Sequence, residues 1–379
     1  MNSQVKVVHM TTVHHPYDPR IYFKQCMSLY NAGYDVTLIA KQAEHEDVHQ
    51  HPISHVPLKK YSSRWKRMVF GSFDIFRKAK KLHADMYVFH DPELLFVGWL
   101  LKRRNNIVIY DIHEDYVTSI LQKKYLNPFA RKLFARIYRI VEKMLTKKME
   151  LSLAEKYYQE MYPKGKCILN YPILEQNVFD KNSDKSPLEN KLLYTGNVTE
   201  DRGALIQAEI PQINEHVDVH FVGKCTSKLA NDMYEKAGNR KSYINIEGID
   251  RFIEKEQMVE IYASRRWLAG IALFPPTEHY MKKELTKFFE YMNVGLPIIC
   301  SDFPSWKDFV EQYQCGIAVN PYNKEEINAA IEKLRNDPQL NEKMGNNGRK
   351  VVQEQLNWKI EEQKLLEWYE QLIKDSVNK

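Results

Sequence analysis

A lysine and a glutamate stand one helical turn apart in the segment 284–303, ELTKFFEYMNVGLPIICSDF. Apolar residues recur there at helical spacing, and Gly295 and Pro297 end the expected helix before a short apolar strand at 297–301. The Glu290 carboxylate can accept two hydrogen bonds, and the Lys287 ammonium can neutralise an anion. Spacing alone fits a solvated pair on a surface helix better, so the chemistry needs support from elsewhere in the chain.

A second group suited to anions follows the strand expected at 191–196, in the stretch TGNVTEDRG. Gly196 lies at the strand end and Gly203 lies before the next helix, and glycines there let backbone amides approach an anion. Arg202 can bind a phosphate with two hydrogen bonds. Such a loop is a weak signal by itself. Its place at the start of the second half of the chain strengthens it.

Polar clusters also follow two strands of the first half. They are His90 and Asp91 after one strand, and His113, Glu114 and Asp115 after the next. Histidines and carboxylates are metal ligands. However, these two clusters contain no His-x-x-x-His spacing, and the chain has no Cys-x-x-Cys and no Asp-x-Asp, so we expect no metal and no cofactor.

The loop 14–20, HHPYDPR, follows the first expected strand and contains Tyr17, Asp18 and Arg20. It is rich in polar groups and stiffened by two prolines. Because Pro and Asp are frequent turn formers, an ordinary turn is the alternative interpretation.

Short apolar runs alternate with helical patterns along both halves, which predicts parallel sheets covered on both faces and ligands bound beyond the carboxyl ends of the strands. In the first half the runs lie at 5–13, 35–40, 86–90 and 107–112. In the second they lie at 191–196, 217–223, 243–248, 270–274 and 297–301. Helices are expected at 324–335, 339–355 and 358–374.

The length of 379 residues fits two domains of this kind. We expect a first domain at 1–172, a polar linker at 173–190, a second domain at 191–355 and a terminal helix at 356–379. Five scattered cysteines indicate a reducing compartment. Neither a signal peptide nor a membrane-spanning run is evident, so we expect a cytoplasmic protein.

Several of these motifs together resemble the retaining GT-B glycosyltransferases of glycosyltransferase family 4 (group 1), over nearly the whole chain. The segment 287–298 resembles the family's signature, which closes the nucleotide-sugar pocket. The stretch 111–114 resembles its Asp-x-His-Glu segment, and 196–203 its Gly-x-x-x-x-x-Arg-Gly loop. The signature matches are Lys287, Phe288, Glu290, Tyr291, Met292, Gly295, Pro297 and Ile298.

The resemblance implies an α/β protein of the GT-B fold, with two Rossmann-like domains facing each other across a cleft and a last helix crossing back to the first. It also implies an enzyme that moves a hexose-type sugar from a nucleotide diphosphate donor to an acceptor with retention of configuration and without a metal. Front-face attack assisted by the leaving phosphate is the usual picture of this chemistry, so no protein nucleophile is sought.

Roles follow residue by residue from the same resemblance. Glu290 would hold the ribose, Arg202 and Lys287 the departing diphosphate, and His113 the transferred sugar. The family's first signature glutamate touches the donor sugar; Lys282 stands at its position, with Glu278 or Glu284 as substitutes. The family's Gly-Gly in the first loop is also absent. The residues expected on the acceptor side are Tyr17, Asp18, Arg20, His90, Asp91 and Glu114.

The two halves differ in charge. Residues 1–172 carry 28 Lys and Arg against 16 Asp and Glu, whereas the remainder is net acidic. An amphipathic helix after Asn127-Pro128 has an apolar stripe, which we expect to pack on the sheet, and a basic face. That face suits an anionic membrane surface, where a lipid-linked or surface-polysaccharide acceptor would be met at the inner face. No nucleic-acid module is recognisable, so nucleic acid is a weaker alternative.

Two other classes of function stay open. One is another enzyme on the same fold, a nucleotide-sugar epimerase or a phosphorylase relative. The other is a non-catalytic sugar-nucleotide or membrane-binding member of a glycan assembly complex, motivated by Lys282 and the missing Gly-Gly. The sequence leaves the oligomeric state open.

Overall fold

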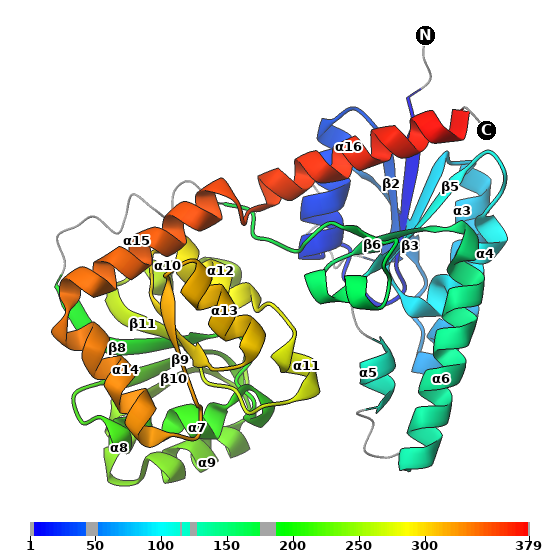
Figure 1. Ribbon diagram of the computed structural model, residues 1–379. Helices are drawn as coiled ribbons and strands as arrows, with labels where there is room; N and C mark the ends of the chain where they lie inside the picture. Colours follow the sequence, from blue (N-terminus) through cyan, green and yellow to red (C-terminus); the bar gives the residue numbers. More distant parts are fainter. Residues whose placement is uncertain (1–3, 43–51, 114–115, 122–126, 175–186, 378–379) are drawn as a thin grey trace. The chain divides into compact units, whose positions relative to one another are not determined.

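The computed structural model describes residues 4–42, 52–113, 116–121, 127–174 and 187–377. The chain divides into two compact units, each built around one sheet (Figure 1). Unit 1 contains residues 1–170 and 358–379, and unit 2 contains residues 171–357. The divisions therefore fall after residues 170 and 357, compared with 172 and 355 in the sequence-based division, and the last helix is part of unit 1.

Seven parallel strands form the sheet of unit 1, in the order β3-β2-β1-β4-β5-β6-β7. Val7 of β1 pairs with Val36 on one side and with Met86 on the other. The runs expected at 5–13, 35–40, 86–90 and 107–112 are strands here, whereas β3, β6 and β7 had no prediction. The strands are β1 Lys6–Met10, β2 Asp35–Lys41, β3 Ser54–Leu58, β4 Met86–Phe89, β5 Ile107–Ile112, β6 Glu150–Leu153 and β7 Lys166–Cys167.

Helices cover both faces of this sheet, and a buried apolar cluster lies under each. The π-helical η1 (Pro19–Cys26), α1 (Met27–Asn31) and α16 (Trp358–Val377) pack on one face. The other face is covered by α3 (Ser72–Leu82) and α4 (Leu95–Leu101). The short segments of unit 1 are α2 Arg64–Lys66, η2 Arg67–Gly71, η3 Pro92–Leu94, α5 Tyr116–Leu121, η4 Thr146–Lys148 and η5 Lys156–Glu160.

The amphipathic helix α6 (Pro128–Leu145) forms as predicted, with the Asn127 side chain accepting from the Ala130 amide at 2.7 Å as an N-terminal cap. It packs on α4 and α5 (Figure 1), and its Tyr138 and Leu145 pack against the apolar cluster under α3 and α4. The expectation that its apolar stripe packs on the sheet holds for Leu145 and is wrong for the rest of the stripe, because α3 and α4 already occupy that face. The exposed residues of the stripe are Phe129, Leu133, Phe134, Ile137, Ile140, Val141 and Met144.

Unit 2 contains six parallel strands in the order β10-β9-β8-β11-β12-β13. All five predicted strands are present, and β13 had no prediction. The strands are β8 Leu188–Thr195, β9 Asp218–Cys225, β10 Ile244–Ile249, β11 Arg266–Ala272, β12 Ile298–Ser301 and β13 Gly316–Val319.

The helices of unit 2 connect these strands and complete the layers on the sheet. The helix of the signature segment, α12 (Thr286–Asn293), ends where predicted, since Gly295 has the left-handed φ of +71° that such a stop requires. The others are η7 Glu200–Arg202, α7 Ala204–Ala208, α8 Ile210–Ile213, α9 Ser227–Ala237, η8 Gly238–Tyr243, α10 Lys255–Ala263, α11 Glu278–Met281, α13 Pro304–Gln312, α14 Lys324–Asn336 and α15 Pro338–Glu354.

Each sheet has one place where the strand order reverses. In unit 1 it lies between β1 and β4, and in unit 2 between β8 and β11. In open parallel sheets the loops diverge at such a switch point and leave a crevice beyond the carboxyl ends of the strands. Ligands are therefore expected beside the ends of β1 and β4 and of β8 and β11.

Trp358 anchors α16 in unit 1. Its ring is buried in the cluster under η1, and its Nε1 donates to Ser28 Oγ at 3.0 Å. Trp358→Ala should lower the free energy of unfolding of unit 1 by about 3–5 kcal/mol, because it leaves a large cavity. Urea unfolding gives the size, and hydrogen exchange should locate the lost protection in unit 1.

The exposed Trp65 provides the control, since Trp65→Ala removes little buried surface and should cost less than about 0.5 kcal/mol. Equal losses in the two variants, or lost protection confined to unit 2, would contradict the assignment of α16.

Candidate functional site

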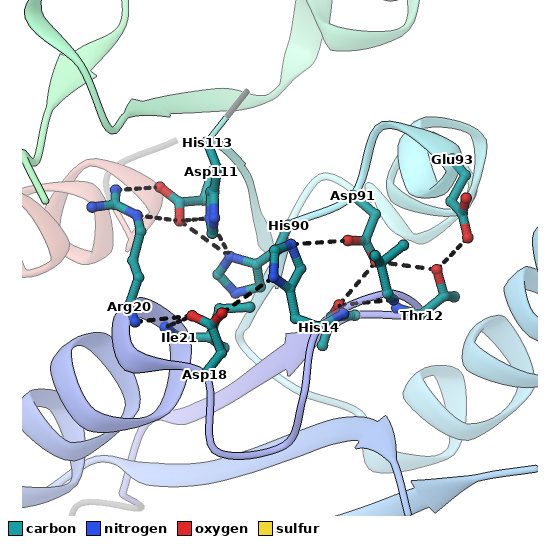
Figure 2. Close-up of polar contacts among 12 residues, drawn as sticks. Thr12, His14, Asp18, Arg20, Ile21, His90, Asp91, Glu93, Asp111 and His113 are labelled. Carbon is teal, nitrogen blue, oxygen red and sulfur yellow. Dashed lines mark hydrogen bonds and ion pairs between the residues drawn. The ribbon is translucent and has the colours of Figure 1, made fainter. Parts of the chain in front are cut away.

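The Asp111 carboxylate lies fully buried at the end of β5 and is the centre of a polar cluster in unit 1 (Figure 2). Arg20 donates a hydrogen bond to each of its two oxygens, from Nη2 to Oδ1 at 2.7 Å and from Nε to Oδ2 at 3.1 Å. Ser152 Oγ donates to Oδ1 at 2.6 Å, and Gln25 Nε2 donates to Oδ2 at 2.8 Å. Burial raises the pKa of Asp111, but Arg20 and His113 outweigh burial and hold it well below its usual range.

Two histidines complete the contacts of Asp111. His90 Nδ1 lies 3.1 Å from Oδ2, and His113 Nε2 contacts the same oxygen. The other nitrogen of His90 lies 3.0 Å from His9 Nδ1, so His90 fits a neutral ring that accepts from His9 and donates to Asp111. Burial lowers the pKa of His90 to about 4, with opposition from Asp111, so this ring is uncharged near neutral pH. His113 is the more exposed of the two.

Asp91, after β4, fixes the chain that leaves β1. Its Oδ2 accepts from the Thr12 amide at 2.5 Å and from Thr11 Oγ1 at 3.0 Å, and its Oδ1 lies 3.5 Å from His14 Nε2 (Figure 2). The other ring nitrogen of His14 lies 3.2 Å from Asp18 Oδ2. Both loops are therefore tied together at the switch point between β1 and β4.

Asp18 also caps η1, because its Oδ1 accepts from the amides of Arg20 and Ile21 at 2.9 and 3.0 Å. Burial raises the pKa of Asp18, but the hydrogen bonds from His14 and from the Ile21 amide outweigh it and hold the pKa well below its usual range. Asp18 is therefore a structural anion that sets the start of η1 and the tilt of the His14 ring.

The residues expected on the acceptor side differ in how far they are buried. Arg20, His90 and Asp91 are buried, and Asp111 binds the Arg20 guanidinium. The expectation that Arg20 contacts phosphate or acceptor stays a prediction, and its burial does not favour it. Tyr17 lies half-buried, with its ring edge-on to Tyr22 at 5.2 Å, and packs against the cluster under η1. Glu114 and Asp115 lie outside the described residues.

His90, Asp111 and His113 are the one group of metal-ligating side chains in the described part of the chain whose donor atoms converge, within 4.8 Å of one another. Two histidines and a carboxylate suit a transition metal. However, the oxygens of Asp111 already accept from Arg20, Gln25 and Ser152, and a divalent ion there would lie beside a guanidinium. We therefore interpret the group as a hydrogen-bond network that orients His113.

In unit 2 the central charge is Lys287 on α12, at the carboxyl edge of the sheet. Its side chain is 6% exposed, and Nζ lies 3.5 Å from the centre of the Tyr194 ring and 5.0 Å from that of Phe274. Among the described residues Nζ has no hydrogen-bond partner. Burial, and then the positive charge of Arg202, hold the pKa of Lys287 well below its usual range against the opposing effect of Glu290. A solvated surface lysine is thereby excluded.

Glu290, one turn further on, is exposed and linked to the sheet edge through tyrosines. Tyr262, buried on α10, donates to Glu290 Oε2 at 2.9 Å and lies 2.9 Å from Thr195 Oγ1 at the end of β8. Burial and the Glu290 charge hold the pKa of Tyr262 far above its usual range, so the hydroxyl remains a donor. One carboxylate oxygen is thus held by the protein, while the side chain faces solvent.

The loop after β8 brings Arg202 to the same edge. Arg202 Nε donates to the Tyr280 hydroxyl at 3.2 Å, and that hydroxyl donates to Asp201 Oδ2 at 2.8 Å. Gly203 has a left-handed φ of +76°, and a Cβ there would lie 1.8 Å from the Leu273 carbonyl oxygen, so no other residue fits. Gly196 also has positive φ, and no atom within 4 Å would meet a Cβ, which leaves its backbone open to a ligand.

The substitutes considered for the family's first glutamate lie on or next to the short helix α11. Lys282 ends this helix and is exposed, and Glu284 is half-buried. Glu278 opens it, and its side chain is outside the described part. The geometry therefore favours none of the three as a contact to a sugar.

Sequence reasoning missed the tyrosines that connect these groups. Tyr262 lies 28 residues before Glu290 and Tyr280 lies 78 residues after Arg202, and neither stands in a recognisable motif. Tyr291, which does stand in the signature, is fully buried, and its hydroxyl accepts from the Thr195 amide at 3.1 Å. Burial of a tyrosine hydroxyl next to a strand end is a property of the fold, which sequence spacing does not reveal.

Comparison with known proteins identifies the second unit's relatives. Residues 252–351, which include α12 with Lys287 and Glu290, match the family described as Glycosyl transferases group 1. This match confirms the resemblance predicted for the signature segment. A search of curated protein sequences found no match.

Solved structures resemble the chain over almost its whole length. A sucrose-phosphate synthase from Thermosynechococcus elongatus has a TM-score of 0.72 at 17% identity, covering 98% of this chain and 100% of its own. HepE from Anabaena, solved with UDP-glucose, has a TM-score of 0.69 at 13% identity, with coverages of 97% and 100%. WaaG, a glycosyltransferase involved in lipopolysaccharide biosynthesis, has a TM-score of 0.67 at 14% identity, with coverages of 95% and 98%. At such identities the likeness is one of fold.

The buried pair of Arg20 and Asp111 gives a stability prediction. Asp111→Asn should lower the free energy of unfolding by about 3–5 kcal/mol, because the guanidinium is left buried without its counter-charge. This difference in the free energy of unfolding should shrink below about pH 4. There Asp111 becomes protonated in the unfolded wild-type chain but stays ionised in the folded protein, which lowers the stability of the wild type. Urea unfolding against pH measures both effects.

Asp74→Asn is the matched control, since the Asp74 pair with Lys78 is part-exposed and should contribute less than about 1 kcal/mol. If Asp111→Asn costs no more than this control, or if its cost grows as the pH falls, the interpretation of Asp111 as the buried anchor is wrong.

Proposed function

We propose that this glycosyltransferase transfers a sugar from a nucleoside diphosphate sugar to a glycan acceptor with retention of configuration. The proposal starts from the match of residues 252–351 to the group 1 family and from the GT-B fold of the chain. We place it in glycosyltransferase family 4. The transferred group is of the hexose type, and the acceptor is a lipid-linked or surface-polysaccharide intermediate.

The observation that carries this proposal is the pair of cations at the carboxyl edge of unit 2. Lys287 is buried without a hydrogen-bond acceptor among the described residues, and Arg202 lies close enough to lower its pKa further. Burying Lys287 close to a second cation costs free energy that the neighbouring Glu290 offsets only in part, and a bound dianion would recover it. A diphosphate supplies that charge, and as the leaving group it gains negative charge in the transition state.

Glu290 supports a nucleotide rather than a bare diphosphate. Tyr262 fixes one of its oxygens, and a carboxylate held in this way can accept both ribose hydroxyls. Gly196 and Gly203 would let the backbone approach the phosphates. In this proposal Lys287 and Arg202 take the role that a metal has in other transferases, so no metal is required.

His113 is the residue of unit 1 that we assign to the reacting sugar. Its Nε2 contacts Asp111, which leaves Nδ1 to accept a hydrogen bond from a sugar hydroxyl when the ring is neutral. Asp111, His90 and Arg20 act through His113 as positioning residues. Attack of the acceptor on the same face as the leaving phosphate needs no nucleophile from the protein.

UDP is the nucleotide to test first, because the Anabaena structure of the same fold was solved with UDP-glucose. The lipopolysaccharide role of WaaG and the basic first half of the chain support an acceptor at an anionic membrane. We propose a cytoplasmic protein that binds peripherally at the inner face. No helix among the described residues is long and apolar enough to span a bilayer.

A non-catalytic sugar-nucleotide binding role is the second candidate, and the observation that favours it is the exposed Lys282 where the family has a glutamate. An epimerase is the third. Incubation with UDP-glucose and a mixture of membrane-derived glycans separates the three. Release of UDP that depends on acceptor supports transfer, conversion of the donor without acceptor indicates an epimerase, and binding without turnover indicates the non-catalytic role.

Glu290→Gln should raise the Kd for UDP about 10- to 100-fold, because a charged acceptor of two hydrogen bonds becomes a neutral amide with one acceptor atom. Isothermal titration calorimetry measures the change. Glu311→Gln is the matched control, since Glu311 is an exposed glutamate of the same unit whose Lys307 contact is 4.0 Å, and it should stay within about twofold. Equal affinity in both variants would remove Glu290 from the donor site.

A further inference from the structure

One surface of unit 1 exposes large apolar side chains from three neighbouring helical segments. The segments are residues 64–82, residues 92–104 and residues 128–148, and we call their exposed side the outer layer. Within it α4 contacts both α3 and α6, so the three segments lie side by side (Figure 1). Its exposed apolar residues are Trp65, Val69, Phe70, Phe73, Phe96, Trp99, Leu100, Phe129, Leu133, Phe134, Ile137, Ile140, Val141 and Met144.

Exposure of this extent is unusual for a soluble surface. Phe129 is 77% exposed, Trp65 76% and Met144 64%. Phe96 and Trp99 stack on each other at 5.6 Å on α4 instead of packing inward. Monomeric proteins rarely expose contiguous apolar patches of this size unless they bind another surface.

The same layer is strongly basic. The three segments contain 17 Lys and Arg residues against three acidic ones. Those three acidic residues offset little of the positive charge on the exposed side of the outer layer. Glu142 is buried, Glu93 is hydrogen-bonded to Arg67 and Thr12, and Asp74 pairs with Lys78. The outward charge therefore has one sign.

This combination selects the partner. Positive charge requires an anionic surface, which argues against a second copy of this equally basic layer. Nucleic acid would use the charge and the aromatic rings, but it gives no burial to Leu133, Ile137, Ile140 or Met144. An anionic bilayer satisfies both parts, with headgroup phosphates for Lys and Arg and the acyl boundary for the apolar side chains.

We propose that the outer layer of unit 1 inserts into the interfacial region of an anionic bilayer, with its apolar side chains among the upper acyl carbons and its Lys and Arg side chains at the headgroups. The inference rests on the proposed function, which brings a lipid-linked acceptor to this protein. It deepens that proposal by naming the surface and by making apolar insertion, rather than charge alone, the main source of binding.

The test is partition of the full chain into vesicles of phosphatidylcholine with about one third phosphatidylglycerol, compared with pure phosphatidylcholine. Phe129→Ser/Met144→Ser should weaken partition about 100-fold, roughly tenfold for each side chain. Phe252→Ser/Tyr322→Ser is the matched control, because it removes two equally exposed aromatic side chains from unit 2. The control should partition like the wild type.

Two further readouts separate insertion from simple attraction. Tryptophan fluorescence should shift to the blue on binding and be quenched by brominated acyl chains, and Trp65→Phe/Trp99→Phe should remove most of that signal. Raising salt from about 0.1 to 0.5 M should weaken binding but leave a measurable part, because screening affects the charges and not the apolar contacts.

Three results would overturn the proposal: no binding to the anionic vesicles, binding that high salt abolishes and Phe129→Ser/Met144→Ser leaves unchanged, or sedimentation showing that this variant abolishes self-association instead. UDP binding measured on the same proteins keeps the two claims apart. A variant that no longer binds vesicles but still binds UDP supports the proposal. If the wild type binds vesicles but does not bind UDP, only the donor site is contradicted.

Discussion

A buried ammonium group that has no hydrogen-bond acceptor among the described residues is the constraint on which unit 2 depends. Lys287 lies on the helix that precedes β12, and the aromatic rings of Tyr194 and Phe274 lie next to its Nζ in place of a carboxylate. Rings attract a cation weakly, by about 0.5–2 kcal/mol, and do not replace the lost water. The protein therefore keeps this group in an unfavourable state that a dianion would relieve. The rigid surroundings, with Gly203 against the Leu273 carbonyl and Tyr291 bonded to Thr195, hold the group in place.

The two switch points use the same topology with opposite charge arrangements. At the ends of β1 and β4, the charged side chains named above have partners within unit 1, since Arg20 binds Asp111, and Asp18 and Asp91 bind backbone amides and His14. What this leaves accessible is His113, a polar group held in a fixed orientation. At the ends of β8 and β11, Lys287 is buried without a hydrogen-bond acceptor among the described residues and lies close enough to Arg202 for the two charges to interact. A neutral contact to a sugar and a positive contact to a diphosphate are the chemistry that these two arrangements suit.

Sequence patterns predicted the parts of the fold that periodicity determines, including α12, its stop at Gly295 and most strands. They missed β3, β6, β7 and β13, which are short or lie at sheet edges, where fewer residues are buried. Motif resemblance placed Lys287, Glu290 and Arg202 near one strand edge, but the partners Tyr262 and Tyr280 come from distant positions with no pattern of their own. Arg20 was assigned to a ligand because sequence cannot show that Asp111 lies beside it. The stripe of α6 was assigned to the core because amphipathicity shows that a face is apolar and not what covers it.

The central claim is that Lys287 awaits a diphosphate, and the most direct test is calorimetric titration of UDP in two buffers with different ionisation enthalpies. The buried ammonium has a lowered pKa, and a bound dianion should raise it, so UDP binding should take up protons at a pH where free Lys287 is partly neutral. Uridine, which lacks the phosphates, should not cause uptake, and Lys287→Met should abolish it. Binding without proton uptake in the wild type, or with the same uptake in Lys287→Met, would contradict the account.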